Sequence, residues 1–148
     1  CARKLREQNS CAGMITVFIL TNRFRADLPQ DFECRTISLP VATNASSELI
    51  AAACSILQHI YKKGYAYKKA GCVVSAIVPK NEVQLNLFDE TDRVRLQRLY
   101  NTVDRVNKKN GTDSLKIAAQ GYGKKWKLKS EHISKRYTTN LNDIITIR

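Results

Sequence analysis

The sequence predicts an α+β fold, with a four-stranded, mixed or antiparallel sheet, two helices on one of its faces and a short basic C-terminal extension. Three observations predict it. Four short segments are rich in β-branched residues, two longer segments carry apolar residues at helical spacing, and the composition changes after residue 121. A chain of 148 residues has the size of one ordinary domain and can bury a core without disulfides or metal.

The first expected elements are the end of a helix and two strands. Residues 2–12 are expected to finish a helix before Gly13, and residues 14–21 form a strand because β-branched and aromatic side chains dominate this segment. Residues 33–39 alternate between apolar and polar side chains, which indicates a second strand. Pro40 is expected to end that strand, because proline cannot donate a hydrogen bond to a sheet.

Two helices are predicted from apolar residues at helical spacing. The first begins at Ser46 or Ser47, which favour the N-cap position, and stops at Gly64. The second spans residues 91–109 and has Asp92 in its expected cap. The apolar positions are Leu49, Ile50, Ala53, Ile56, Leu57 and Ile60 in the first helix, and Leu96, Leu99, Val103 and Val106 in the second.

The remaining elements complete a two-layer arrangement. Residues 67–78 and 114–119 are predicted as the third and fourth strands, and residues 80–90 as a connector that leads into the second helix. Because every strand and helix must bury one face, the economical solution places both helices on one face of the sheet. The other sheet face is then open to a partner. The expected organisation is a main domain over residues 1–120 and a basic extension over residues 121–148.

The charge of the chain points to a polyanionic partner. The sequence has 25 Lys and Arg against 13 Asp and Glu, a net charge of +12. Such an excess is typical of proteins that bind nucleic acid and, less often, an anionic membrane surface. The extension has two possible structures, an arm that lies along DNA or an appendage packed on the domain. Its apolar residues Trp126, Tyr137 and Ile144 favour the packed appendage.

Composition excludes several other classes of protein. The longest apolar stretch, residues 14–20, is too short to cross a bilayer, and the charged start of the chain is not a signal peptide. The five cysteines form no CxxC pair, and the two histidines lie far apart, so we expect reduced, buried thiols in a cytoplasmic protein and no metal site. Because the first residue is Cys, we expect this chain to be part of a longer protein.

A pentapeptide in the connector carries the clearest functional signal. Gln84, Leu85, Asn86, Leu87 and Phe88 place three apolar side chains in a polar loop, and exposed apolar clusters mark contact sites. Either Leu87 and Phe88 fold back onto the core, or they dock on a partner. The pattern resembles the QLxLF peptide by which bacterial polymerases and repair proteins bind the ring-shaped sliding clamp, with Leu87 and Phe88 as the anchors.

The resemblance extends over nearly the whole chain. Successive segments ARKLRE, ITVFI, CRTISLP, YAYKKAGC and QLNLFDE, and then KWKLKSE and YTTN in the extension, are similar to the C-terminal part of one family. This family is the UmuC subfamily of Y-family translesion DNA polymerases, which act in DNA repair and mutagenesis during the bacterial SOS response.

The resemblance implies that this chain binds other molecules and carries no catalytic residues. It implies a βαββαβ little finger domain that lies in the DNA major groove, with a subfamily-specific extension. The carboxylates that hold two Mg²⁺ ions in the polymerase palm would precede this chain, so we expect it to be non-catalytic and to bind no cofactor. The implied partners are the DNA backbone, contacted without sequence preference, the sliding clamp, UmuD′ and RecA.

Candidate contact residues follow from the open sheet face and from the resemblance. Backbone phosphates are commonly held by Lys, Arg, Ser and Thr. The candidate DNA contacts are Thr16, Arg23, Arg35, Thr36, Ser38, Lys68, Lys69, Ser75 and Lys116, and the candidate contacts from the extension are Lys124, Lys125, Trp126, Lys127 and Lys129. The alternative function is a stand-alone protein-interaction module whose basic charge is incidental.

Overall fold

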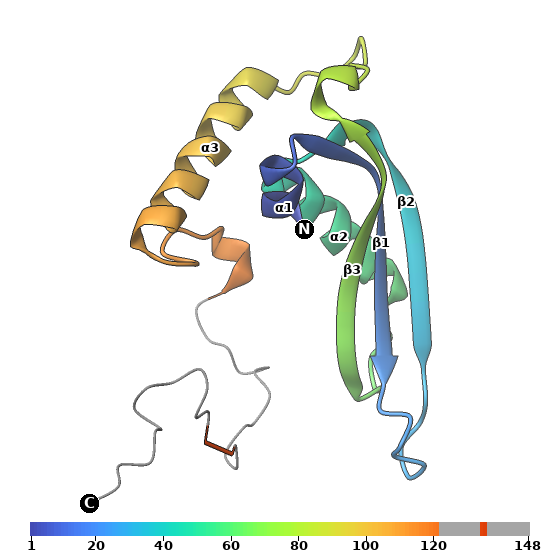
Figure 1. Cartoon of the computed structure of the whole chain (residues 1–148). Coiled ribbons are helices and arrows are strands. Elements are labelled where there is room, and N and C mark those ends of the chain that lie inside the picture. Colours follow the sequence, from blue (N-terminus) through green and yellow to red (C-terminus); the bar gives the residue numbers. More distant parts are fainter. Residues whose placement is uncertain (122–133, 136–148) are drawn as a thin grey trace, which may run out of the picture. The chain divides into compact units, whose positions relative to one another are not determined.

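The computed structural model describes residues 1–121 and 134–135, and the chain divides into two compact units, residues 1–116 and 117–148. In the first unit the elements are α1 (Ala2–Glu7), β1 (Ser10–Thr21), β2 (Phe32–Thr43), α2 (Ser46–Ile60), β3 (Tyr67–Pro79), the 3₁₀ turn η1 (Lys80–Glu82) and α3 (Arg93–Asn110) (Figure 1). The described part of the second unit contains the 3₁₀ turn η2 (Ala118–Gln120). Among the described residues, no helix has both the length and the apolarity that a bilayer crossing requires.

The sheet has three antiparallel strands in the order β2-β1-β3, with β1 in the centre. Alternate β1 residues point to opposite faces, and Ile15, Val17 and Ile19 are buried on the face that α2 covers. The other face carries Thr16 and Phe18, which are half-buried. The buried core consists of Leu5, Ala12, Ile15, Val17, Ile19, Leu49, Ile56 and Ile60. The predicted α+β class is therefore confirmed, with a sheet that has one open face.

The predicted fourth strand over residues 114–119 is wrong. This segment forms turns and the start of η2, and no strand is assigned to it. The side chain of Asn107 explains the difference, because its Oδ1 accepts from Leu115 N at 2.7 Å and its Nδ2 donates to Leu115 O at 2.8 Å. Both backbone groups of Leu115 are thus bonded to a side chain from α3, and neither is left for a sheet.

The prediction that Pro40 ends the second strand is also wrong. β2 runs through Pro40 as far as Thr43. It tolerates the proline because β2 is an edge strand, and because the pairing with β1 jumps from Met14–Ser38 to Ala12–Thr43, which leaves Pro40 inside a bulge. A residue at such a position needs no ladder hydrogen bond from its own nitrogen.

The helix starts differ in how they are capped. Asp92 caps α3 as predicted, since its side chain accepts from Arg95 N at 2.8 Å. The expected serine cap of α2 does not form, and the N-cap is Ala45. Instead, Ser47 N donates to the Tyr100 hydroxyl at 2.8 Å, so a residue of α3 satisfies a free amide in the first turn of α2.

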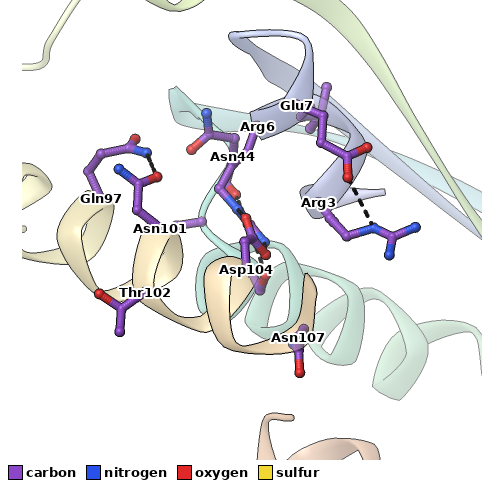
Figure 2. Close-up of polar contacts among 12 residues, drawn as sticks. Arg3, Arg6, Glu7, Asn44, Gln97, Asn101, Thr102, Asp104 and Asn107 are labelled. Carbon is purple, nitrogen blue, oxygen red and sulfur yellow. Dashed lines mark hydrogen bonds and ion pairs between the residues drawn. The ribbon is translucent and has the colours of Figure 1, made fainter. Parts of the chain in front are cut away.

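One buried arginine fixes α3 to the rest of the unit. The Arg6 side chain is only 6% exposed, and its Nε and Nη2 donate to the two carboxylate oxygens of Asp104 at 2.6 and 2.8 Å. Its Nη1 donates to the backbone oxygen of Asn44 at 2.7 Å, and its guanidinium lies 4.9 Å from the Tyr100 ring centre. We call Arg6, Asn44, Tyr100 and Asp104 the Arg6 latch, and Figure 2 shows Arg6, Asn44 and Asp104 of this group. α3 is thus held through α1 and the first turn of α2. Of the two long helices only α2 packs on the sheet, together with Leu5 of α1, so the expectation that both long helices cover one sheet face is not met.

The cysteines are mostly exposed, contrary to the prediction of buried thiols. Cys11 alone is buried, and burial raises the pKa of its thiol. The other four thiols, Cys1, Cys34, Cys54 and Cys72, are free and exposed. Three of these residues lie at the chain start, on the edge strand β2 or on the outer side of α2, where neighbouring elements leave them uncovered.

Candidate docking peptide and nucleic-acid interface

The pentapeptide Gln84–Phe88 lies on an irregular segment between η1 and α3. Its apolar side chains are exposed, at 65% for Leu85, 92% for Leu87 and 85% for Phe88. Gln84 and Asn86 are exposed as well. In this structure Leu87 and Phe88 do not fold back onto the core, so both are free to contact another molecule. We call residues 84–88 the docking peptide.

A local turn orients the two outermost side chains. Phe88 N donates to Asn86 Oδ1 at 3.1 Å, and Asp89 N donates to the backbone oxygen of Asn86 at 3.0 Å. An asparagine that closes such a turn with its own side chain fixes the backbone without help from a partner. Leu87 and Phe88 occupy the middle of this turn, which explains why both project into solvent.

The chain is anchored on both sides of the docking peptide. Upstream, Lys80 N donates to Asn9 O at 2.9 Å. Downstream, Asp89 accepts from Arg93 Nε at 2.6 Å, and this hydrogen bond holds the pKa of the Asp89 carboxyl below its usual value. Arg93 in turn donates from Nη1 to Glu48 Oε2 of α2 at 2.9 Å. The docking peptide is therefore a short, exposed loop between two fixed points.

An apolar cleft of about 420 Å³ lies beside the docking peptide. Val83 and Leu85 line it from the connector, Leu96 and Tyr100 from α3, and Ala42 from the end of β2. Leu85 therefore has an apolar surface of the same unit next to it, which accounts for its lower exposure than that of Leu87.

Five candidate DNA contacts share the open sheet face. The strand register pairs Thr16 with Thr36, Met14 with Ser38 and with Ser75, and Leu20 with Lys69, and directly paired residues lie on the same face. Thr16 and Thr36 also share a hydrogen bond of 2.8 Å between their hydroxyl oxygens. The structure thus brings Thr16, Thr36, Ser38, Lys69 and Ser75 together on the face that α2 leaves uncovered.

The other four candidate DNA contacts lie elsewhere. Arg35 pairs with Val17, which places it on the helix-covered face of the exposed edge strand. Lys68 lies at the register shift between β1 and β3. Arg23 belongs to the β1–β2 loop, where its guanidinium lies 5.9 Å from the Phe32 ring centre, and Lys116 follows α3. The extension residues Lys124, Lys125, Trp126, Lys127 and Lys129 fall outside the described residues.

Phe18 has a packing role that the sequence analysis missed. Phe18 pairs with Gly71 of β3, and a Cβ atom added at Gly71 would lie 2.4 Å from the Phe18 Cζ. The aromatic ring therefore covers the glycine on the open face. A glycine inside a predicted strand was the available signal, since such glycines mark a close approach by another group.

A polar network at the end of the sheet was not predicted either. Tyr67 donates its hydroxyl to Asp31 Oδ2 at 2.7 Å, while Lys62 Nζ donates to Asp31 Oδ1 at 3.0 Å and to Glu33 Oε1 at 2.6 Å. The pKa of Asp31 is lowered, mainly by the hydrogen bond that it accepts from Tyr67 and next by the one that it accepts from Lys62. The hydrogen bonds that Lys62 donates to Glu33 and Asp31 raise the pKa of Lys62. The network ties the β1–β2 loop to β3 and to the end of α2.

Asp31 should make the stability of the domain depend on acid pH. Because its pKa is lowered on folding, its contribution is complete above the unfolded value of about 4 and is lost as the pH falls through the lower folded value. Asp31→Asn should therefore flatten the loss of stability on acidification, as measured by urea unfolding at several pH values. Asp113→Asn is the control, because Asp113 is exposed and lies outside the network. Equal pH profiles for wild type and Asp31→Asn would contradict the role of the network.

Two acidic side chains that follow the docking peptide have structural partners. Asp89 binds Arg93, and Asp92 caps α3. Within residues 1–121 and 134–135, no group of three or more His, Cys, Asp or Glu is placed to hold a metal ion. The two exposed features that this region presents are the docking peptide and the open sheet face.

Comparison with known proteins assigns the family. Residues 1–87 match the impB/mucB/samB family C-terminal domain, and residues 97–147 match a domain of unknown function, DUF4113. The chain is 34% identical over 144 residues to Protein ImpB of Salmonella typhimurium, 32% over 148 residues to Protein UmuC of the same species (strain LT2), and 33% over 144 residues to Protein MucB of Escherichia coli. These matches cover 97–99% of this chain and 34–35% of each relative, so the chain spans about a third of their length. The resemblance seen in the sequence is confirmed, and the chain belongs to the impB/mucB/samB family through the C-terminal domain of that family.

Proposed function

We propose that this chain is the DNA-gripping and clamp-docking region of an error-prone translesion DNA polymerase that acts in the SOS response. The observation that carries the proposal is the docking peptide, in which Leu87 and Phe88 are 92% and 85% exposed between two anchored ends. Exposed apolar anchors on a fixed turn are what a pocket on a partner protein requires. Membership of the impB/mucB/samB family supports the same function.

In this proposal the chain holds the DNA and docks the polymerase on the sliding clamp, and the rest of the polymerase catalyses nucleotide incorporation. The Mg²⁺ ions and their carboxylate ligands would belong to the palm, and the chain itself would incorporate no nucleotide. The extension over residues 121–148, with a net charge of +5, would contact partners such as UmuD′ and RecA in the cytoplasm.

The open sheet face is the proposed DNA-gripping surface. It presents hydroxyl groups from Thr16, Thr36, Ser38 and Ser75, and the ammonium group of Lys69 at the end of the face. These groups suit phosphate oxygens and carry no information on base sequence. A bypass polymerase needs such contacts, because it must hold templates whose bases are damaged.

Salt dependence separates this proposal from the alternative of a protein-interaction module. The chain should bind duplex DNA of any sequence, and the logarithm of its binding constant should fall with the logarithm of salt concentration by about 0.9 for each phosphate neutralised. Lys69→Gln should reduce that slope, as measured by fluorescence anisotropy. The control is Lys63→Gln, which removes the same charge from an exposed site outside the sheet. Binding to the clamp without binding to DNA would favour the interaction module.

A further inference from the structure

The outer face of α3 carries a regular row of cations. Tyr100 and Asp104 point toward α1 and α2, where they belong to the Arg6 latch. On the opposite side of the helix, positions separated by three and four residues form a continuous stripe. The stripe consists of Arg95, Arg98, Thr102, Arg105 and Lys109, all of them exposed. Figure 2 shows Thr102 on the side of α3 away from Asp104.

No carboxylate neutralises this row in the part of the chain that the structure describes. The two carboxylates of α3 and its N-cap already have other partners, because Asp104 binds Arg6 and the Asp92 side chain caps α3. Among the described residues, none of the four stripe cations forms an ion pair. A solvated helix face normally mixes charges of both signs, so four cations without an acid mark a surface for an anion.

We infer that the stripe is a second DNA-backbone surface, separate from the open sheet face. This inference rests on the proposed function in that its ligand is the same duplex. The stripe runs from Arg95 to Lys109, a span of 15 residues, and is therefore about 21 Å long at the rise of an α-helix. A duplex offers a phosphate charge about every 1.7 Å along its axis, so a row of this length faces several phosphates. Arginine, lysine and threonine are common donors to phosphate oxygens.

The charge of the surrounding sequence agrees with a polyanionic ligand. Residues 97–147, which match the domain of unknown function, contain 11 basic and four acidic residues, a net charge of +7. Residues 1–87 contain 11 basic and six acidic residues, a net charge of +5 over a longer segment. The inference gives the first helix of the unassigned domain a role, which is to hold DNA beside the C-terminal domain of the family.

The test compares two triple variants of the full 148-residue chain. The stripe variant is Arg95→Gln, Arg98→Gln and Arg105→Gln. The control is Arg3→Gln, Lys4→Gln and Lys63→Gln, which removes the same charge from exposed positions outside both surfaces. The stripe variant should bind a 20-base-pair duplex about tenfold more weakly or worse at low salt, with a salt slope smaller by about 0.9 per lost phosphate contact. The control should change little.

Three results would overturn the inference. Equal losses in the stripe variant and the control would show a general effect of net charge. Unchanged DNA binding by the stripe variant, while the wild type binds DNA, would exclude the stripe but leave the proposed function standing. Failure of the wild type to bind both DNA and the clamp would instead reject the proposed function together with the inference. Glutamine is a good helix former, so thermal unfolding of the variant should match the wild type.

A footprint on the unmodified protein gives an independent check. Duplex DNA should protect Lys109 from acetylation by an N-hydroxysuccinimide ester, as measured by mass spectrometry, whereas Lys4 should stay reactive. Equal reactivity of Lys109 with and without saturating DNA would contradict the inference.

Discussion

Replacing both Leu87 and Phe88 with alanine should remove most of the binding of this chain to a bacterial sliding clamp. Both side chains are exposed in the free chain, so a partner pocket would bury nearly all of their apolar surface. Loss of two pocket anchors typically costs about 2 kcal/mol or more each, which corresponds to a weakening of more than a hundredfold for the pair. Isothermal titration calorimetry with purified clamp measures the change.

The matched control replaces exposed apolar residues outside the docking peptide. Val94 and Leu99 of α3 are 62% and 52% exposed, and alanine at both should leave clamp binding unchanged. Neither double variant should lower the melting temperature much, because none of the four side chains belongs to the core. Clamp binding that survives Leu87→Ala with Phe88→Ala would remove the docking peptide from the proposed function.

Replacing Arg6 with methionine should cause the largest loss of stability. The substitution keeps the aliphatic stem but leaves Asp104 and the Asn44 carbonyl without their donor. Breaking a buried ion pair costs about 3–5 kcal/mol, and we expect about 3 kcal/mol here because Asp104 stays 27% exposed. Urea unfolding measures this loss. Arg3→Met is the control on the same helix, since Arg3 is 55% exposed and pairs only with Glu7, so its effect should stay below about 1 kcal/mol.

A double-mutant cycle separates the ion pair from the other contacts of Arg6. If the Arg6–Asp104 ion pair provides most of the stability of the Arg6 latch, the double variant Arg6→Met with Asp104→Ala should lose clearly less free energy of unfolding than the sum of the two single losses. Additive losses would show that Arg6 stabilises the unit mainly through the Asn44 carbonyl and the Tyr100 ring.

Local patterns in the sequence were sufficient where local forces decide the structure. The helices α2 and α3 follow from apolar spacing, and the α3 cap follows from Asp92. The exposure of Leu87 and Phe88 agrees with their position in a polar connector, where a turn closed by Asn86 needs only neighbouring residues. Thr16, expected on the open sheet face, lies there, opposite the buried Ile15 and Val17.

Contacts between distant residues decided what the sequence could not show. Arg6 and Asp104 are 98 residues apart, and nothing in either neighbourhood indicates that they pair. The loss of the fourth strand depends on Asn107, whose side chain reaches the Leu115 backbone eight residues later. In both cases a side chain forms a hydrogen bond with a residue that lies outside its own turn of the chain. Local sequence patterns do not indicate such a bond, which forms only when the elements pack together.

The anchoring of the docking peptide limits how far a bound partner can move. Phe88 lies five residues before Arg93, so even a fully extended chain keeps the two within about 18 Å. A peptide at the end of a long free tail would let its partner explore a much larger volume. Under the proposed function, the short span would hold a bound ring at a high local concentration beside the same domain. A duplex that passes through that ring would then emerge close to the C-terminal domain, which would shorten the search for the primer end after each new encounter.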